Sequence, residues 1–72
     1  MKITKEQYEA NLMITYHFIK EFIKNNNYSP SMREIANSTG RSIDTIFNHV
    51  YKLKDLGYID FVEGKARTIR LK

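Results

Sequence analysis

The hydrophobic positions in the first third of the chain repeat every three or four residues, as one face of an α-helix does. They are Tyr8, Leu12, Tyr16, Ile19 and Ile23, with Met13, Phe18 and Phe22 beside them. Thr4 followed by Gln7 has the spacing of a capping box, and Ile3 is placed to pack on Tyr8 as a hydrophobic staple. A long amphipathic helix is therefore expected from about residue 5 to the asparagine run at 25–27, where the side chains compete with the helical backbone.

Residues 28–40 predict an extended segment followed by a short second helix. Pro30 keeps Ser29 out of the α region, so the segment 28–30 is expected to be extended. Ser31 and Glu34 form a second capping box, which predicts a helix that runs to about residue 38. Gly40 then ends this helix, because glycine accepts the left-handed conformation of a helix C-terminus without steric cost.

A third helix follows directly, in the arrangement of a helix-turn-helix. Ser42 is its expected N-cap, and Gly57 is the residue just past its end. Ala36, Gly40 and Ile46 have the spacing of such a motif, because the alanine lets two helices cross closely and the isoleucine packs beneath it. The stripe predicted to be buried is Ile46, Val50, Leu53 and Leu56. One face of this helix is thus held rigidly, and the other is free.

After Gly57 the hydrophobic period changes from helical to alternating, which indicates strands. Residues 58–63 and 68–72 alternate, and the basic segment 64–67 between them is a turn. Two strands after a helix-turn-helix form a winged helix-turn-helix. The predicted fold is mainly α with a small β-hairpin, three helices plus a two- or three-stranded wing, with Tyr28 and Ser29 supplying the third strand. We expect residues 1–72 to form this one domain.

Composition narrows the functional classes. The chain has 72 residues and carries 12 Lys and Arg against 8 Asp and Glu, a net charge of +4 that suits a polyanionic partner. It has no cysteine, so disulfides and thiolate metal sites are excluded, and a reducing cytoplasm is the expected location. No apolar run approaches the roughly 18 residues that span a bilayer, and the start of the chain lacks the apolar core of a signal peptide.

Two further motifs lie at the start of the second helix and along the third. Residues 27–36 are Asn-Tyr-Ser-Pro-Ser-Met-Arg-Glu-Ile-Ala, and His49-Val50, Leu53 and Gly57-Tyr58-Ile59 follow. The first resembles the Gly-x-Pro-Pro-Ser/Thr-x-Arg-Glu-Ile stretch of LexA-type SOS repressors, and the others resemble the family's His-Leu, Leu and Gly-hydrophobic-Ile positions. The resemblance covers about residues 8–72. It implies a winged-helix fold, operator DNA as ligand, and base contacts from the early turns of the third helix.

The chain departs from that family at two points. The repressors' second domain, a Ser/Lys autoprotease and dimerisation domain, has no counterpart in these 72 residues, so self-cleavage is not carried over. The stretch between Ile35 and His49 is also one residue shorter than in the family, so the family's recognition residues transfer only approximately.

The free face of the third helix supplies the candidate base-reading residues, which are Ser42, Asp44, Thr45, Phe47 and Asn48. Asn48 can pair bidentately with adenine N6 and N7, a contact worth about 1–3 kcal/mol of discrimination, or is simply solvated. Phe47 either touches thymine methyl groups or packs against the wing. Asp44 either accepts from cytosine N4 or favours the helix N-terminus through the dipole, and Thr45 contacts DNA or bonds its own backbone.

A second group of residues is suited to the sugar-phosphate backbone. It consists of Ser29, Ser31, Arg33, Arg41, Tyr51, Lys52, Lys54, Lys65 and Arg67. The first three surround the start of the second helix, where free N–H groups and the positive end of the helix dipole attract phosphate. The last two lie at the wing tip, within reach of backbone or minor groove. Ordinary solvation is the alternative for each basic residue, and capping alone is the alternative for Ser31.

Nothing in the sequence indicates catalysis, a metal site, a cofactor or a small-molecule ligand. His17 and His49 have no partner nearby in the sequence and are expected to be structural or surface residues. There is no glycine-rich phosphate loop, and no Ser/Lys pair stands in a recognisable setting.

The leading interpretation is a sequence-specific winged helix that binds double-stranded DNA, a transcriptional repressor or regulator with its third helix in the major groove. A homodimer through exposed aromatic residues such as Phe18 or Phe22 is a secondary expectation, because operators are commonly read as two half-sites. The alternative is a module that docks on a polymerase, a replication protein or another regulator, since Ile43, Phe47 and Tyr51 place apolar surface on the free face. A third interpretation is the DNA-binding part of a longer, effector-controlled regulator.

Overall fold

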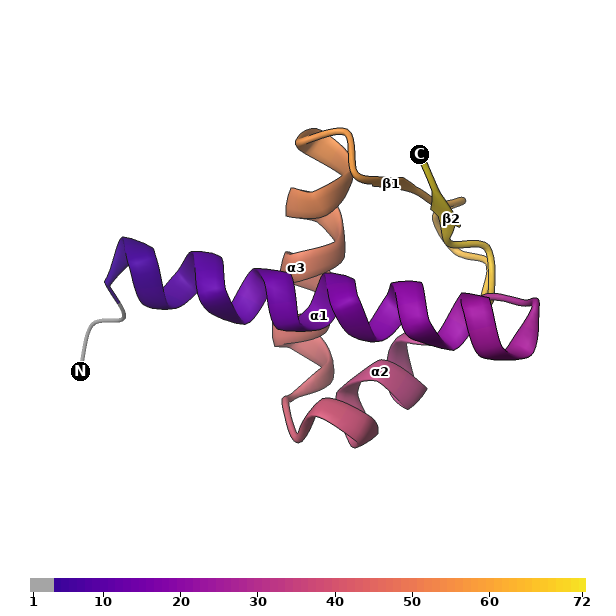
Figure 1. Ribbon diagram of the computed structural model, residues 1–72, viewed down its shortest axis with the longest axis horizontal. Helices are drawn as coiled ribbons and strands as arrows, with labels where there is room; N and C mark the ends of the chain where they lie inside the picture. The colour runs from indigo at the N-terminus through magenta and orange to yellow at the C-terminus, as the bar shows by residue number, and fades with distance from the viewer. Residues whose placement is uncertain (1–3) are drawn as a thin grey trace.

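The elements of the chain follow the order helix, helix, helix, hairpin in a computed structural model that describes residues 4–72. They are α1 (Lys5–Asn26), α2 (Met32–Thr39), α3 (Ile43–Asp55), β1 (Ile59–Asp60) and β2 (Arg70–Leu71). In Figure 1, α1 runs along the whole molecule, α3 crosses it near the middle, and the hairpin lies toward the C-terminal end of α1. This arrangement is a winged helix-turn-helix, and the prediction of that fold is confirmed. The hairpin, residues 59–71, is called the wing below.

The first two helices begin at reciprocal capping boxes, as their sequences predict. The Gln7 N–H donates to Thr4 Oγ1 at 3.1 Å, and the Thr4 N–H donates to Gln7 Oε1 at 3.0 Å. At the start of α2, Ser31 and Glu34 exchange the same pair of bonds, at 3.1 and 2.9 Å. Each box satisfies two N–H groups that an isolated helix end leaves without partners. The predicted staple from Ile3 lies outside the described residues.

Left-handed residues end α1 and α2, and a tight turn ends α3. Asn27 caps α1 with φ 62°, and Gly40 caps α2 with φ 70°. At the end of α3, the Gly57 N–H donates to the Lys54 carbonyl and the Tyr58 N–H to the Leu53 carbonyl, both at 3.0 Å. Those two bonds define a Schellman motif, which requires the positive φ that Gly57 adopts at 86°. The chain therefore leaves α3 in a fixed direction toward the wing.

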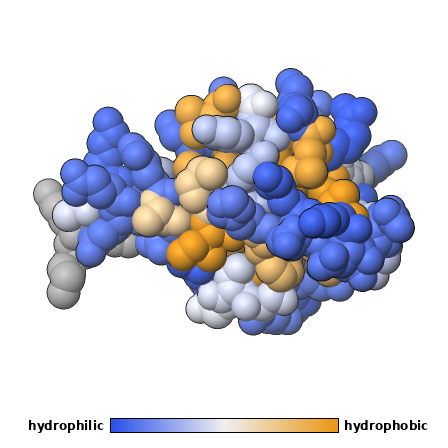
Figure 2. All heavy atoms as spheres, in the orientation of Figure 1, coloured by the Kyte–Doolittle hydropathy of each residue, from blue (hydrophilic) through white to orange (hydrophobic). Residues whose placement is uncertain are grey.

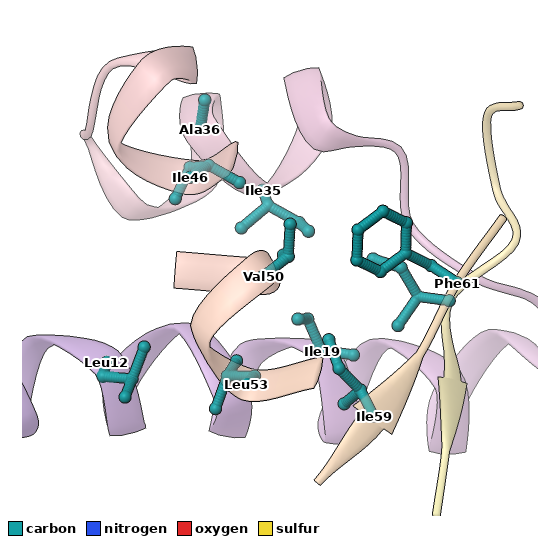
Figure 3. Packing of buried hydrophobic residues seen from close by; sticks show 10 residues of the cluster. Leu12, Ile19, Ile35, Ala36, Ile46, Val50, Leu53, Ile59 and Phe61 are labelled. Carbon is teal, nitrogen blue, oxygen red and sulfur yellow. The ribbon is translucent and has the colours of Figure 1, made fainter. Parts of the chain in front are cut away.

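The core collects apolar side chains from all three helices and from the wing (Figure 3). Its buried members are Leu12, Ile19, Ile35, Ala36, Ile46, Val50, Leu53, Ile59, Phe61 and Ile69. Ala36 lies beside Ile46 where α2 meets α3, as the motif spacing predicts. The predicted stripe of α3 is correct except at Leu56, which is 52% exposed. Because the helix ends at this residue, Leu56 lies at a surface cavity of about 480 Å³ beside α1 and not in the core.

The wing has much shorter strands than the alternation predicts. Ile59 pairs with Leu71 and Asp60 with Arg70 in a two-stranded antiparallel sheet. Beyond these pairs, side chains replace the ladder: the Phe61 N–H donates to Asp60 Oδ1 at 2.9 Å. The Val62 N–H donates to Thr68 Oγ1 at 2.9 Å, and the Ile69 N–H donates to Ser29 Oγ. Side chains thus satisfy three amide groups that a longer ladder would have paired. Both strands thus lie within the predicted ranges 58–63 and 68–72, but the predicted lengths are wrong.

The third strand expected from Tyr28 and Ser29 is also absent from the described part of the chain, whose sheet has two strands. The segment nevertheless lies beside the wing. The Ile69 N–H donates to Ser29 Oγ at 3.0 Å, so a side chain takes the place of the backbone pairing that the prediction assumed. The extended conformation imposed by Pro30 is what brings this serine to the wing.

Candidate nucleic-acid interface

The helix α3 has one buried face and one exposed face. Ile46, Val50 and Leu53 are completely buried against the other helices. The exposed side carries Ile43, Asp44, Phe47, Asn48 and Tyr51. Within residues 4–72, the side chains of Asp44 and Asn48 make no hydrogen bond. A helix held on one side therefore presents an unengaged polar amide and a carboxylate on the other.

The predicted base-reading residues at the start of α3 are engaged with one another. The Thr45 N–H donates to Ser42 Oγ at 3.2 Å, which makes Ser42 the N-cap. The Ser42 hydroxyl donates in turn to Thr45 Oγ1 at 2.9 Å. Capping thus accounts for the positions of both hydroxyls. Each oxygen keeps a second lone pair on the exposed end of the helix.

Phe47 and Tyr51 line a cavity of about 460 Å³ between α3, the start of α2 and the wing. Phe47 is 39% exposed, so it is neither a core residue nor a fully free one. Tyr51 is 42% exposed and contacts Phe61 edge to face, with ring centroids 5.3 Å apart. On the face of the molecule seen with α1 in front, Figure 2 shows hydrophobic residues gathered in patches among hydrophilic ones. Phe47 thus lies beside the wing and is also partly exposed, a position that is compatible with both predicted roles, DNA contact and packing against the wing.

The start of α2 borders the same cavity. Ser31 and Arg33 line it, and Arg33 is exposed without an ion pair among the described residues. The Ser31 N–H and then the Arg67 guanidinium hold the pKa of Glu34 below its usual 4.5, because both donate hydrogen bonds to the carboxylate. Glu34 is therefore ionised at neutral pH and partly neutralised by its neighbour.

Four residues predicted to contact the DNA backbone have partners inside the domain. Ser29 is buried and bonded to Ile69, and Arg41 donates to Asn11 Oδ1 at 2.7 Å on α1. Lys54 lies 3.8 Å from Asp60 Oδ1 and 4.9 Å from the centroid of the Phe61 ring. Arg67 contacts Glu34 at 2.8 Å. The sequence did not reveal these internal partners, and the assignment of the four residues to the DNA backbone stays a prediction.

Lys52 and Lys65 are exposed and form no ion pair within residues 4–72. Lys65 lies in the wing turn and lines the cavity beside α3, whereas Lys52 lines the cavity on the α1 side. Of the two, Lys65 is the one that shares a surface with Phe47 and Arg33. The cluster around that cavity is the candidate interface.

A buried histidine connects α3 to α1. His49 is 3% exposed, and its Nδ1 lies 2.7 Å from Thr15 Oγ1. The Tyr8 ring meets the imidazole edge to face, with centroids 5.9 Å apart. Burial, and then the charge of Arg41, lowers the pKa of His49 below its usual 6.5. His49 is thus a neutral structural residue, one of the two options considered for it, while His17 is exposed on α1.

The described residues 4–72 contain no cluster of three or more His, Cys, Asp or Glu side chains able to hold a metal ion. No helix in the same range is both long enough and apolar enough to cross a bilayer.

Comparison with known proteins identifies the family. A family model for the LexA DNA binding domain matches residues 2–68, nearly the whole chain. The chain belongs to this family. The resemblance noted at residues 27–36 and along the third helix is thereby confirmed, and the LexA DNA-binding domain is a regulator domain that binds DNA.

Several curated LexA repressors resemble this LexA DNA-binding domain over most of its length. The chain is 38% identical to the LexA repressor of Moorella thermoacetica over 61 residues, 83% of the chain and 30% of the relative. It is 37% identical to that of Caldicellulosiruptor saccharolyticus over 71 residues, 97% of the chain and 33% of the relative. For the Staphylococcus aureus (strain Newman) LexA repressor the identity is 34%, over 97% of the chain and 32% of the relative. The chain spans about a third of the length of these relatives.

Sequence reasoning missed the polar contact that orients α3 in this LexA DNA-binding domain. Thr15 stands between Leu12 and Ile19 in the apolar stripe of α1, and His49 occupies the equivalent place between Ile46 and Leu53 in α3. Two polar residues in two facing stripes are a usable signal for a buried hydrogen bond, because a buried polar group needs a partner.

Proposed function

We propose that this domain recognises double-stranded DNA sequence-specifically, with the exposed face of α3 in the major groove, and that it represses transcription by occupying its site. The division of α3 into two faces supports this most directly. Its core face is buried, whereas Asp44 and Asn48 on the other face have no side-chain hydrogen bond among residues 4–72. A rigid helix with free polar side chains fits a groove about 12 Å wide. The relatives' name, LexA repressor, supports the regulatory part.

Each candidate base-reading residue is assigned one role in this proposal. The Asn48 amide pairs with an adenine edge, and Asp44 accepts from cytosine N4. Phe47 contacts a thymine methyl group, because its ring is partly exposed beside the polar residues. Ser42 and Thr45 offer their remaining lone pairs and methyl group at the first turn. These contacts specify sequence, and the backbone contacts set the position of the domain on the duplex.

The backbone contacts come from both sides of α3. Ser31 and Arg33 bring the start of α2 to a phosphate, where free N–H groups and the helix dipole favour an anion. Lys65 reaches the backbone or minor groove from the wing, and Tyr51 and Lys52 are placed along α3. Ser29, Arg41, Lys54 and Arg67 are left out of the proposed interface, because internal partners hold their side chains.

We also propose that the domain acts as a homodimer on two half-sites, because a single small module buries little DNA surface. Phe18 and Phe22 support a contact at the C-terminal part of α1, where their rings are tilted by 42° with centroids 5.9 Å apart and stay partly exposed. Sedimentation of the domain with and without DNA checks this. A monomer at high concentration in both samples would refute the dimer and leave DNA recognition intact.

The test of the proposed function is enrichment of the purified domain on a random double-stranded DNA library, followed by sequencing. Asn48→Ala is expected to relax one position of the enriched motif, and Lys65→Ala to weaken binding equally to all sequences. The matched controls are Asn25→Ala and Lys5→Ala, which remove the same groups from exposed positions on α1. No enrichment at low salt would overturn the proposal and favour docking on a protein through Ile43, Phe47 and Tyr51.

A further inference from the structure

Arg67, at the end of the wing turn, points back into the domain. Its Nη1 atom lies 2.8 Å from Glu34 Oε1 and donates to the Ser29 carbonyl at 3.2 Å. Its guanidinium carbon lies 5.3 Å from the centroid of the Tyr28 ring. An ion pair, a hydrogen bond and a cation–π contact thus hold the Arg67 side chain. All three partner residues lie in the segment from the end of α1 to the start of α2.

The partners of Arg67 are themselves fixed. Glu34 Oε1 also accepts from the Ser31 N–H at 2.9 Å, so the capping box of α2 sets the direction of the carboxylate. Two residues further along the wing, the Ile69 N–H donates to the buried Ser29 Oγ at 3.0 Å. Residues 67–69 are therefore bonded to the segment 28–34 at two separate points. We call Arg67, Glu34, Ser29 and Tyr28 the wing anchor.

The wing needs such contacts because its own pairing is short. Its two strands are two residues long, and an isolated two-stranded hairpin is at best marginally stable in water. Arg67 also has φ 58°, a left-handed value that is unusual for a residue other than glycine. A non-glycine side chain at such a position is worth functional scrutiny, and here the side chain makes contacts that glycine could not make.

We propose that Arg67 is a positioning residue that holds the wing against the start of α2, and that it does not itself contact a phosphate. The inference rests on the proposed DNA recognition and deepens it. Lys65 lies two residues before Arg67, on the turn that the anchor fixes, and shares a cavity with Arg33 and Phe47. The wing anchor therefore sets the distance between the backbone contact of the wing and the base-reading face of α3.

Salt dependence of DNA binding separates a positioning role from a phosphate contact. Each phosphate contact makes the slope of log affinity against log salt steeper by about 0.9, because affinity falls as salt rises. Arg67→Ala is expected to weaken binding about two- to fivefold with an unchanged slope, since the partly exposed ion pair is of modest strength. A slope reduced by about 0.9 would show that Arg67 contacts a phosphate and would overturn the proposal.

Glu34→Gln provides the matched variant on the other side of the ion pair. Glutamine also completes a capping box, so α2 keeps its start while the charge is lost. If Arg67 acts through Glu34, Glu34→Gln weakens binding as Arg67→Ala does, and the double variant is no weaker than Arg67→Ala alone. If Arg67 contacts DNA, removing the neighbouring negative charge tightens binding, and that result would overturn the proposal. Arg70→Ala, which removes an exposed wing charge paired with Asp60, controls for net charge.

Coupling to Lys65 distinguishes positioning from general destabilisation. In the intact domain Lys65→Ala weakens binding, and in an Arg67→Ala background the same change is expected to have a smaller effect, because the wing is no longer held in place. An equal effect of Lys65→Ala in both backgrounds would mean that Arg67 only stabilises the fold. That outcome would overturn the positioning role.

A measurement without DNA keeps this inference separate from the proposed function. Amide hydrogen exchange at Ile69 is expected to be faster in Arg67→Ala, while the amides of Val50 and Leu53 in α3 stay unchanged. If the unmodified domain enriches no DNA motif, the proposed function fails. The exchange measurement still tests whether Arg67 holds the wing against the start of α2. Unchanged exchange at Ile69 would show that Arg67 does not hold the wing.

Discussion

The three helices and the wing are held together by different kinds of interaction. Where α1, α2 and α3 meet, side chains such as Ile19, Ile35 and Ile46 have no exposed surface, and packing is continuous. The wing adds three buried apolar residues, but its course between the strands depends on side-chain hydrogen bonds, in which Ser29 and Thr68 accept from backbone N–H groups and Arg67 donates.

This difference shows which part of the fold is specified by the local sequence. Each helix carries its own start and end signals, so the boundaries of the helices follow from neighbouring residues. The wing receives its shape from residues about 40 positions earlier, as the bond from Ile69 to Ser29 illustrates. Changes in the helices should therefore act on the whole fold, and changes at the wing should act locally.

The largest effect is expected from a cavity in the helical core. Ile46→Ala removes a fully buried side chain at the contact of α2 and α3 and should lower the free energy of unfolding by about 2–5 kcal/mol. Urea denaturation followed by circular dichroism measures this. Ile43→Ala, one turn earlier and 39% exposed, is the matched control and should change stability far less. Equal effects of the two would contradict the division of α3 into a buried and an exposed face.

Ser29→Ala should have the next largest effect, confined to the wing. It leaves the buried Ile69 N–H without its acceptor, which costs about 1–3 kcal/mol when no water replaces it. Amide exchange should accelerate at residues 61–69 and stay unchanged in α1. Ser38→Ala, at an exposed position of α2, is the control. Accelerated exchange throughout the domain would show that the wing and the helices unfold as one unit.

Ser31→Ala tests a local start signal in the helical part. The loss of the cap should cost about 1 kcal/mol, because one N–H at the start of α2 loses its acceptor. Ser31→Asp supplies another good capping group and should restore most of that stability. Denaturation midpoints of the two variants decide the matter, and a Ser31→Asp protein no more stable than Ser31→Ala would argue against capping.

Acidification should weaken the helical core first. The pKa of His49 in the folded protein lies below its usual 6.5, because burial disfavours the charged ring. The unfolded chain therefore binds a proton more readily, and the free energy of unfolding should fall as the pH drops below 6.5. Stability curves at several pH values, compared with His49→Gln, measure this. A His49→Gln protein with the same dependence between pH 7 and 5.5 would assign the titration elsewhere.

A smaller loss of stability, at lower pH, is expected in the wing. The Phe61 N–H, and then Arg70 and Lys54, hold the pKa of Asp60 below its usual 3.8 against the opposing effect of burial. Asp60 thus contributes stability above pH 3.8 that is lost as the pH falls through its folded value. Asp60→Asn should flatten the stability profile only in this acidic range. A change near neutral pH in that variant would contradict the assignment.

The sequence predicted the helices well because their signals are local. Thr4, Ser31 and Ser42 all cap the helices that were expected to follow them, and Gly40 and Gly57 end two of them. The strand lengths were not predictable, because alternation does not show where side chains replace the ladder. Leu56 fits the helical stripe but lies at the helix end, where the stripe leaves the core.

The candidate interface could be predicted only as a list of residue types. Basic residues near a helix-turn-helix look alike in the sequence, and their partners are distant: Arg41 contacts Asn11, and Arg67 contacts Glu34. Asn48 and Lys65 are exposed, while the side chains of Arg41 and Arg67 bond to partners within the domain. Only the packing of the helices and wing distinguishes them.

The exposed face of α3 is free of the bonds that hold the domain together. Asp44 and Asn48 have no side-chain hydrogen bond within residues 4–72, and the residues that fix α3, such as Thr15 and His49, lie on the opposite side. In the proposed mode of recognition, substitutions at 44 and 48 therefore change sequence preference while the fold tolerates them. A library randomised at these two positions should therefore yield many folded domains, among which new sequence preferences can be selected without redesign of the core.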